Sequence, residues 1–418
     1  MTLPHPASFL LLLALMMPAT AQAERGDRIL ELPIHGSGAE GLQATGEVYR
    51  RYVSPPPGLL GELGPQRRVA SFEVNYNPDS CPDGTTTPWT QEARDAFSYA
   101  VSIWAAILNA NVTIEIDACW RNDLATNTLG SAGATAFARD FDNAPVASTR
   151  FPIALANQLA GEDLNGTDVE IDARFNSNFT WYFGTDGSTP AAEVDFVTVV
   201  LHEIGHGLGF SGGANYDDGT DNAECNGVAG NGCIGSPPRR YNQFVEDVNG
   251  TSILNYASPS IALGNVITSG SLFWDSTTAN LFNGGQRVEL FAPTTWNPGS
   301  SYSHLGQVFN GTEHALMTFA LNNGEAIHYP GRVTLGILQD QGWDIRNTTS
   351  VIVDGSYTGS VQTGSPGNPF DTFAEGMQAV YPNGSVIVRP GSYDEQLTVI
   401  KAALIRGDGS GSVVIGRQ

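Results

Sequence analysis

Residues 199–210, Val-Val-Leu-His-Glu-Ile-Gly-His-Gly-Leu-Gly-Phe, hold the most specific pattern in this chain of 418 residues. On a helix, residues four apart lie one turn above each other on the same face, so His202 and His206 can bind one metal ion together. Glu203 lies beside them and can reach a water molecule at that ion. A different face is expected in the core, because apolar residues recur at helical spacing: Val197, Val200, Leu201, Ile204 and Leu208.

Flanking residues predict both ends of this helix. Thr189 and Pro190 offer an N-cap and a proline in the first turn. Gly207 and Gly209 let the chain leave the helix sharply, because glycine tolerates the positive φ angles of a C-terminal cap. A helix between these signals carries both histidines.

The pattern His-Glu-x-x-His is typical of zinc metalloproteases, in which the histidines hold zinc and the glutamate is the general base. A pair of packed histidines without a metal ion is the alternative. A catalytic zinc ion needs three protein ligands. The histidines that follow the helix are His304, His314 and His328.

Residues 202–210 resemble the first part of the metzincin signature H-E-x-x-H-x-x-G-x-x-H. Gly212 stands where that family has its third histidine, and glycine has no side chain to bind a metal ion. The third ligand must therefore come from elsewhere. Residues 301–305 and 315–317 look like the corresponding region of leishmanolysin-like metzincins, in which a long insertion separates the second and third histidines.

Metzincins also carry a methionine in a tight turn beneath the zinc ion, a short way after the third ligand. Met317 is the methionine of this region, and His304 precedes it with room for a loop and a turn. His314 is too close to Met317, and His328 follows it. The resemblance therefore implies His304 as the third zinc ligand, with His202 and His206. Filling of a gap in the core is the alternative role for Met317.

The resemblance implies an α+β fold, a metzincin-type zincin domain at residues 69–346 with an insertion at about 211–300. Apolar spacing predicts a helix at 93–108, and alternation predicts strands at 112–116 and 169–175. The segment 333–343, with its apolar anchors, looks like the final helix of the metzincin family. The strand at 169–175 comes just before the zinc helix. It matches the edge strand along which zincin proteases align an extended peptide by main-chain hydrogen bonds.

The N-terminus and the cysteines indicate secretion. An apolar run at residues 9–17 and the small-x-small site Ala21-Gln22-Ala23 predict a signal peptide at residues 1–23, too short to span a bilayer. No other stretch is long and apolar enough for a membrane helix. Four cysteines fit an oxidising compartment. Pairing of sequence neighbours joins Cys81 to Cys119 and Cys225 to Cys233; other pairings and a Cys₂ zinc site remain open.

The formal charge of −23, from 43 acidic and 20 basic residues, argues against nucleic acid or an anionic membrane as a partner. Acidic residues cluster in loops at 162–168 and 217–221, which are candidates for Ca²⁺. Neither loop matches the twelve-residue EF-hand spacing, so solvated loops are the alternative.

Residues 24–68 form a pro-segment or an N-terminal arm that is rich in glycine and proline and ends at Arg67-Arg68. The segment has no cysteine, so a cysteine switch, as known in metzincins, has no residue to work with. No sequence pattern in the insertion at 211–300 indicates a function.

The composition changes again at about residue 347. Short β-branched runs separated by Gly, Pro and Asn follow, with a helical segment at 370–380. The module at 347–418 resembles the start of a right-handed parallel β-helix, and a small β-sandwich is the alternative. The expected strands lie at 351–353, 386–388, 397–399, 404–405 and 413–415.

These patterns predict a secreted zinc endopeptidase that acts on protein or peptide substrates with Glu203 as the catalytic base. Two other functions stay open. One is a binding or adhesion protein with a degenerate protease domain, and the other is a carbohydrate-active protein that uses the β-helix module. The module is also a candidate binder of surface glycans or proteins.

Overall fold

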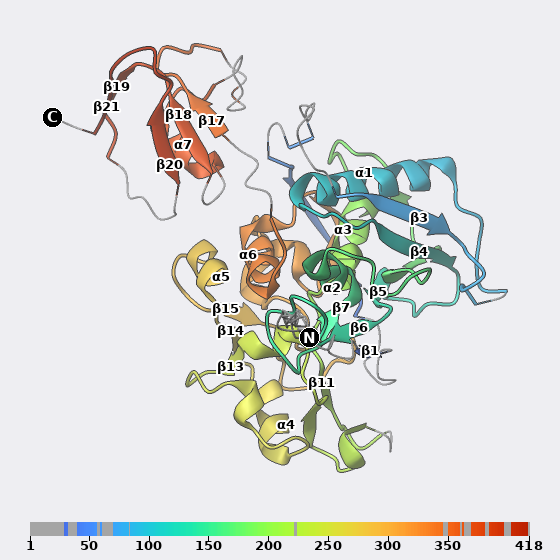
Figure 1. Cartoon of the computed structure of the whole chain (residues 1–418). Helices are drawn as coiled ribbons and strands as arrows, with labels where there is room; N and C mark the ends of the chain where they lie inside the picture. Colours follow the sequence, from blue (N-terminus) through green and yellow to red (C-terminus); the bar gives the residue numbers. More distant parts are fainter. Residues whose placement is uncertain are drawn as a thin grey trace, which may run out of the picture.

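The structure is a computed structural model, shown in Figure 1. The predicted signal peptide, Arg67 and Arg68 lie outside the residues that the structure describes, as does the strand expected at 397–399. No helix in the described part of the chain is long and apolar enough to cross a membrane. The described residues are 29–31, 40–56, 59–60, 70–82, 84–220, 224–345, 350–359, 362, 369–380, 384–396 and 403–416.

A four-stranded mixed sheet forms the centre of the N-terminal half. Its strands lie in the order β3 (Phe72–Tyr76), β4 (Ile114–Arg121), β8 (Ile171–Asn176) and β5 (Gly130–Ala134). The first three strands are parallel, and β5 runs antiparallel to β8 at the edge. The strands predicted at 112–116 and 169–175 are thus present as β4 and β8. The expectation that 169–175 forms the edge is wrong, because β5 pairs with its outer side.

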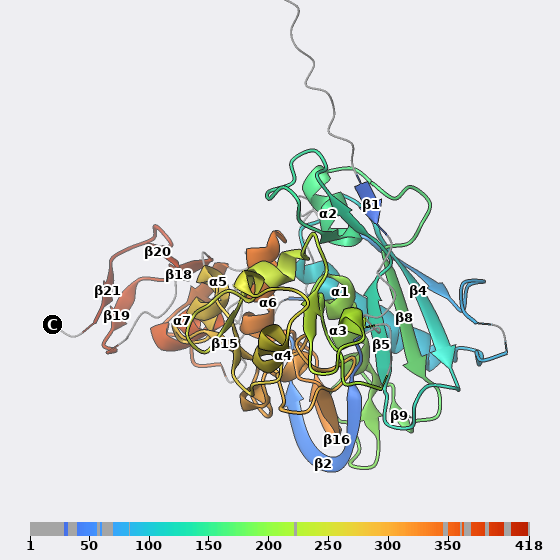
Figure 2. The same ribbon diagram turned by 90° about the horizontal axis from the view of Figure 1, so that it is seen from below.

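Two helices pack together on one side of this sheet, as Figure 2 shows. They are α1 (Gln91–Ile107) and α3 (Phe196–Gly207). The indole Nε1 of Trp104 on α1 donates to the carbonyl of Leu201 on α3 at 3.1 Å. Helix α1, expected at 93–108, begins at the N-cap Thr90, whose hydroxyl accepts from the Ala93 N–H.

The zinc-motif helix α3 begins later than the sequence predicts. Asp195, not Thr189, is its N-cap, and the Asp195 carboxylate accepts from the Thr198 N–H. The reason is that β10 (Val194–Asp195) pairs in parallel with β9 (Trp181–Tyr182), so the chain before Phe196 is extended. The C-terminus agrees with the sequence, because the helix ends at Gly207 and Gly209 has a φ of +115°.

Two smaller sheets lie beside the main one. The N-terminal strand β1 (Ile29–Glu31) pairs with β6 (Phe137–Arg139), which pairs with β7 (Phe151–Pro152) ahead of helix α2 (Ile153–Ala160). The long strand β2 (Gln43–Val53) pairs in parallel with β16 (Ala320–Ile327), from the far end of the domain, as Figure 2 shows. Part of the segment 24–68 is therefore paired into the domain.

The insertion between the second and third histidines is folded and shares the main hydrophobic core, through Tyr241 and Trp274 among others. Cys225 and Cys233 close a loop near its start. Its elements are β11 (Ala214–Tyr216), η1 (Glu224–Asn226), β12 (Gly232–Ile234), η2 (Arg240–Phe244), β13 (Val245–Asp247), η3 (Ile253–Asn255), α4 (Ile261–Ile267), β14 (Leu272–Trp274), α5 (Thr277–Phe282) and β15 (Val288–Leu290).

After the insertion the chain returns to helix α3. The short 3₁₀ turns η4 (Gln307–Phe309) and η5 (Ala315–Met317) precede β16, and helix α6 (Gly331–Gln341) follows it. This is the final helix expected at 333–343. Trp343, just after α6, donates from its indole Nε1 to the carbonyl of Leu208 at 2.7 Å.

The C-terminal module has its own hydrophobic cluster, centred on Val353, Phe373 and Val388, separate from the main core. The elements are β17 (Ser350–Val353), α7 (Phe373–Ala379), β18 (Ser385–Val388), β19 (Gly391–Tyr393), β20 (Leu404–Gly407) and β21 (Val413–Ile415). The described strands pair in parallel, as β17–β18–β20 and β19–β21. Parallel pairing of successive strands suits a solenoid better than an antiparallel sandwich, but the β-helix stays a prediction.

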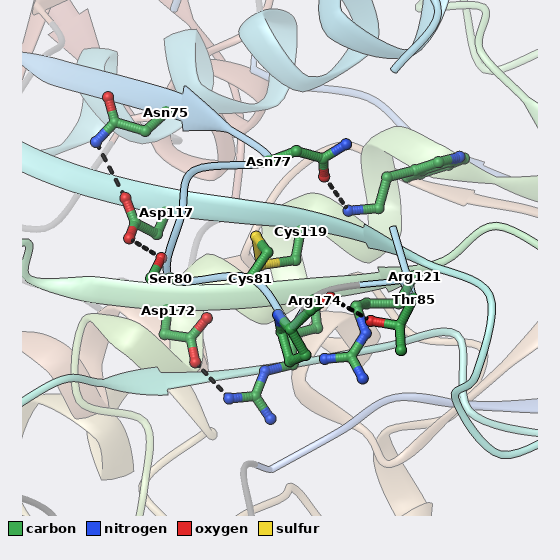
Figure 3. The surroundings of a disulfide bond; sticks show 12 residues. Asn75, Asn77, Ser80, Cys81, Thr85, Asp117, Cys119, Arg121, Asp172 and Arg174 are labelled. Carbon is green, nitrogen blue, oxygen red and sulfur yellow. Dashed lines mark hydrogen bonds and ion pairs between the residues drawn. A yellow bond between two sulfur atoms is a disulfide. The ribbon is translucent and has the colours of Figure 1, made fainter. Parts of the chain in front are cut away.

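Both disulfides join the cysteines that are neighbours in the sequence. Cys81, after β3, is bonded to Cys119 on β4, with a Cα–Cα distance of 5.8 Å (Figure 3). Beside this bond the Asp117 carboxylate accepts from Asn75 Nδ2 at 3.0 Å and from Ser80 Oγ at 2.5 Å. No cysteine is free, which leaves no thiolate for the alternative Cys₂ zinc site.

Candidate metal centre

Three imidazole nitrogens converge at one point. The Nε2 atom of His206 lies 3.0 Å from Nε2 of His202, and Nε2 of His304 lies 3.2 Å from each of them. All three side chains are fully buried. Nitrogen ligands about 2.0–2.1 Å from a tetrahedral zinc ion lie about 3.3 Å from each other, so the spacing is close to that of three zinc ligands.

The other ring nitrogen of each histidine faces a backbone carbonyl. The Nδ1 atoms of His202, His206 and His304 lie 2.6, 2.7 and 2.7 Å from the carbonyl oxygens of Leu316, Phe210 and Ser300. A carbonyl only accepts, so each Nδ1 carries the proton and each Nε2 presents a lone pair. Three lone pairs about 3 Å apart repel one another unless a cation lies between them. The donor set therefore fits a metal ion.

The protonation state of the three rings is also that of metal ligands. Burial lowers the pKa of His202 and His304 well below the ordinary value, and it lowers the pKa of His206 to about 4. The imidazoles are therefore neutral at pH 7, which is the form that binds zinc.

His304 reaches this point because the backbone at His304 and Leu305 is hydrogen-bonded to two other segments of the chain. The Phe291 N–H donates to the carbonyl of His304 at 2.8 Å, and the Leu305 N–H donates to the carbonyl of Met317 at 2.8 Å. The end of β15 and the turn η5 thus hold the third histidine from either side. Local sequence cannot specify such a contact.

Met317 packs directly against helix α3. Its side chain is fully buried, and a Cβ atom on Gly205 would lie 2.8 Å from its Sδ atom. Gly205 is between the two histidines of the helix, and the Leu316 carbonyl beside Met317 accepts from His202. Met317 therefore packs in the core and supports the histidine pair at the same time.

Glu203 is fully buried next to the histidines. Its Oε1 atom accepts from the backbone N–H of Leu42 at 3.1 Å, and its Oε2 atom is buried without a hydrogen-bond partner. Burial raises the pKa of the Glu203 carboxyl well above its ordinary value. The Oε2 atom of Glu203 is thus free to accept a proton from a water molecule held near the three histidine Nε2 atoms.

The two remaining histidines of the domain have other contacts. His328 is buried and its Nε2 lies 2.9 Å from Oδ1 of Asp195, the N-cap of α3. His314 lies beside Glu313, with 3.7 Å between Nε2 and the carboxylate. Among the described residues, His202, His206 and His304 are the one group of three side chains placed to hold a metal ion. The loop at 162–168 forms no such group, and Asp221 of the other calcium candidate lies outside the described residues.

Sequence reasoning did not find the residues of the N-terminal segment that meet this centre. Leu42 reaches Glu203, and Glu40 accepts from the hydroxyls of Ser211 and Ser303. No motif marks this segment, because its contacts are made mainly by backbone groups. A glutamate followed by glycine and leucine is too common to signal a site.

Comparison with known proteins adds one finding. A family model described as SPBPB7E8-like matches residues 72–222, a range that begins with β3. The range includes His202, Glu203 and His206, and it ends before His304. No curated protein and no solved structure matches this chain.

Proposed function

We propose that this protein is a secreted zinc endopeptidase that cleaves protein or peptide substrates, with a leishmanolysin-like metzincin domain at residues 69–346. One observation carries the proposal. Three Nε2 lone pairs from His202, His206 and His304 converge beside the buried carboxylate of Glu203. The two disulfides and the apolar leader support secretion.

Each residue has a distinct role in the proposed reaction. Zinc, when bound by the three histidines, supplies Lewis acidity that polarises the scissile carbonyl and acidifies water. Glu203 takes the proton from the attacking water and passes it to the nitrogen of the leaving amine. The carbonyls of Leu316, Phe210 and Ser300 keep each ring in the ligand tautomer. Met317 supports the helix from below.

The edge strand β5 is the proposed site for the substrate backbone. A Cβ atom on Gly130 would lie 3.1 Å from Oε1 of Glu203, so the start of this strand runs past the catalytic carboxylate. An extended peptide that pairs with β5 would bring its backbone to the same point. Main-chain hydrogen bonds select an extended peptide whatever its side chains, and such binding suits an endopeptidase that cleaves within protein chains.

The other two functions have less support. A degenerate binding protein does not need an intact glutamate next to three converging histidines. A carbohydrate-active protein would need a long groove, and the C-terminal module offers only five described strands. The module remains a candidate binder of surface glycans or proteins within the proposed enzyme.

Metal analysis of the purified full chain, together with casein hydrolysis, tests the proposal. We expect one zinc ion per chain, and hydrolysis that 1,10-phenanthroline abolishes and added zinc restores. Because the N-terminal segment contacts Glu203, hydrolysis is measured before and after limited cleavage by a second protease. A chain that binds no zinc after dialysis against the metal, or hydrolysis that resists the chelator, would overturn the proposal.

A further inference from the structure

Residues 40–44 lie along the outer side of the edge strand β5 and of the loop before it. The Ala132 N–H donates to the carbonyl of Glu40 at 3.0 Å, and the Leu129 N–H donates to the carbonyl of Leu42 at 2.9 Å. The Ala44 N–H donates to the carbonyl of Asn127 at 2.8 Å. The bridges are antiparallel. The chain therefore pairs with its own edge strand as an added peptide would.

The other side of this segment is also paired. The Gly41 N–H donates to the carbonyl of Gly299 at 3.1 Å, and the Gln43 N–H donates to the carbonyl of Phe319 at 3.0 Å. These carbonyls flank the stretch that carries His304 and Met317. The segment is thus held between the two halves of the proposed active site, and Leu42 is buried at its middle.

At its centre the segment engages the catalytic carboxylate. The Leu42 N–H donates to Oε1 of Glu203 at 3.1 Å. The segment therefore occupies one of the two carboxylate oxygens next to which the attacking water must lie if Glu203 is to take its proton. With the segment in place, Glu203 and the three histidines are fully buried.

A buried carboxylate anchors the segment. The Oε1 atom of Glu40 accepts from Ser211 Oγ at 2.8 Å and from Ser303 Oγ at 2.9 Å. Arg239 donates to the same Ser211 hydroxyl and to the carbonyl of Gly212, at 2.8 and 2.7 Å. Burial raises the pKa of Glu40, and the positive charge of Arg239 opposes that shift. The pocket is built for an acidic side chain.

Close packing at Gly41 makes the fit specific. A Cβ atom at this position would lie 2.7 Å from the carbonyl oxygen of Gly130 on β5. Any side chain there would push the segment away from the edge strand. Gly41 therefore permits a closer approach than other residues could make.

We propose that residues 40–43 occupy the substrate position of the protease and keep it latent, with Glu40 as the anchor in the pocket of Ser211, Ser303 and Arg239. This inference rests on the proposed function. Displacement of the segment frees the edge of β5 and Oε1 of Glu203 together. The vacated pocket then takes an acidic side chain, so peptides that carry Glu or Asp are the preferred substrate class.

The test compares zinc-loaded full chains that carry Glu40→Ala, Glu40→Gln or Gly41→Ala with the unchanged protein. Hydrogen exchange at the Leu129 and Ala132 amides reports whether the segment is in place, independently of activity. We expect about tenfold faster exchange or more in Glu40→Ala, since a hydrogen bond to a charged group contributes about that factor. Gly41→Ala should also speed exchange, because its Cβ atom would lie 2.7 Å from the carbonyl oxygen of Gly130. Peptide hydrolysis should rise by a similar factor. Glu40→Gln keeps the shape of the side chain but not its charge. Its exchange and hydrolysis rates should lie between those of the unchanged protein and those of Glu40→Ala.

Glu47→Gln is the matched control, because Glu47 is an exposed glutamate on β2 of the same segment. Its exchange and hydrolysis should equal those of the unchanged chain. An acetylated peptide of residues 40–46, added to Gly41→Ala, should restore protection of Ala132 and inhibit hydrolysis. The same peptide with glutamine in place of Glu40 should bind more weakly.

The outcomes separate the two proposals. Unchanged exchange in folded Glu40→Ala, Glu40→Gln and Gly41→Ala would show that this contact does not hold the segment. Faster exchange with measurable hydrolysis equal to that of the unchanged chain would show that the segment does not cause latency. Faster exchange in zinc-loaded variants that hydrolyse no peptide would instead contradict the proposed protease function.

Discussion

The Nε2 atoms of His202 and His304 lie 3.2 Å apart, although 102 residues separate them in the chain. The insertion between them folds into the main core and returns the chain to helix α3. Each ring donates from Nδ1 to a carbonyl, so neither Nε2 carries a proton to bridge the pair. A cation between them is the simplest way to stabilise this arrangement.

His304→Ala should abolish stable zinc binding and peptidase activity. It removes one of three ligands, whereas loss of a supporting residue typically weakens metal binding about 10- to 100-fold. Zinc titration with a competing chelator measures the change. His314→Ala is the control, since His314 is outside the histidine group. This variant should bind zinc as tightly as the unchanged protein. Loss of zinc from His314→Ala alone would contradict the assignment.

Glu203→Gln should keep zinc and lose turnover by about 10²- to 10⁴-fold, because glutamine retains the shape of glutamate but cannot accept the proton. The ligands themselves are unchanged. Metal content and initial rates are measured on the same sample. Near-normal turnover in a zinc-loaded Glu203→Gln chain would show that another group serves as the base.

Met317→Leu should be tolerated at a cost of less than about 1.5 kcal/mol, because it nearly conserves volume in the core. Met317→Ala should cost about 2–5 kcal/mol, since it leaves a cavity beneath Gly205. Urea unfolding measures both values. Zinc affinity should fall with the alanine variant and not with leucine, because the leucine side chain still supports the helix. Equal stability of both variants would contradict this packing role.

The native protein should contain no reactive thiol, because Cys81–Cys119 and Cys225–Cys233 account for all four cysteines. Thiol labelling before and after unfolding checks this. Replacing Cys81 and Cys119 by serine should destabilise the domain by about 2–5 kcal/mol, since the bond closes a long loop against β4. Two labelled cysteines in the folded protein would contradict the pairing.

Much of this domain could be predicted from local patterns. Helical spacing of apolar residues located α1 and α3, and alternation located β4 and β8, because these patterns reflect which side chains enter the core. The resemblance to metzincins indicated α6. The spacing of His202, Glu203 and His206 indicated one helix face. The cap at Asp195 was missed, because β10 pairs with β9 and holds the preceding residues extended.

Other features depend on tertiary structure. The sequence itself indicated the proposed chemistry of the centre, since two imidazoles and a carboxylate at that spacing on a helix suit zinc binding and proton transfer. The fold alone decided that β5 is the edge strand and that Glu40 and Leu42 lie against it. Those contacts join backbone groups far apart in sequence, and a backbone N–H or carbonyl is the same in nearly every residue. The amino-acid sequence alone therefore does not indicate these backbone contacts.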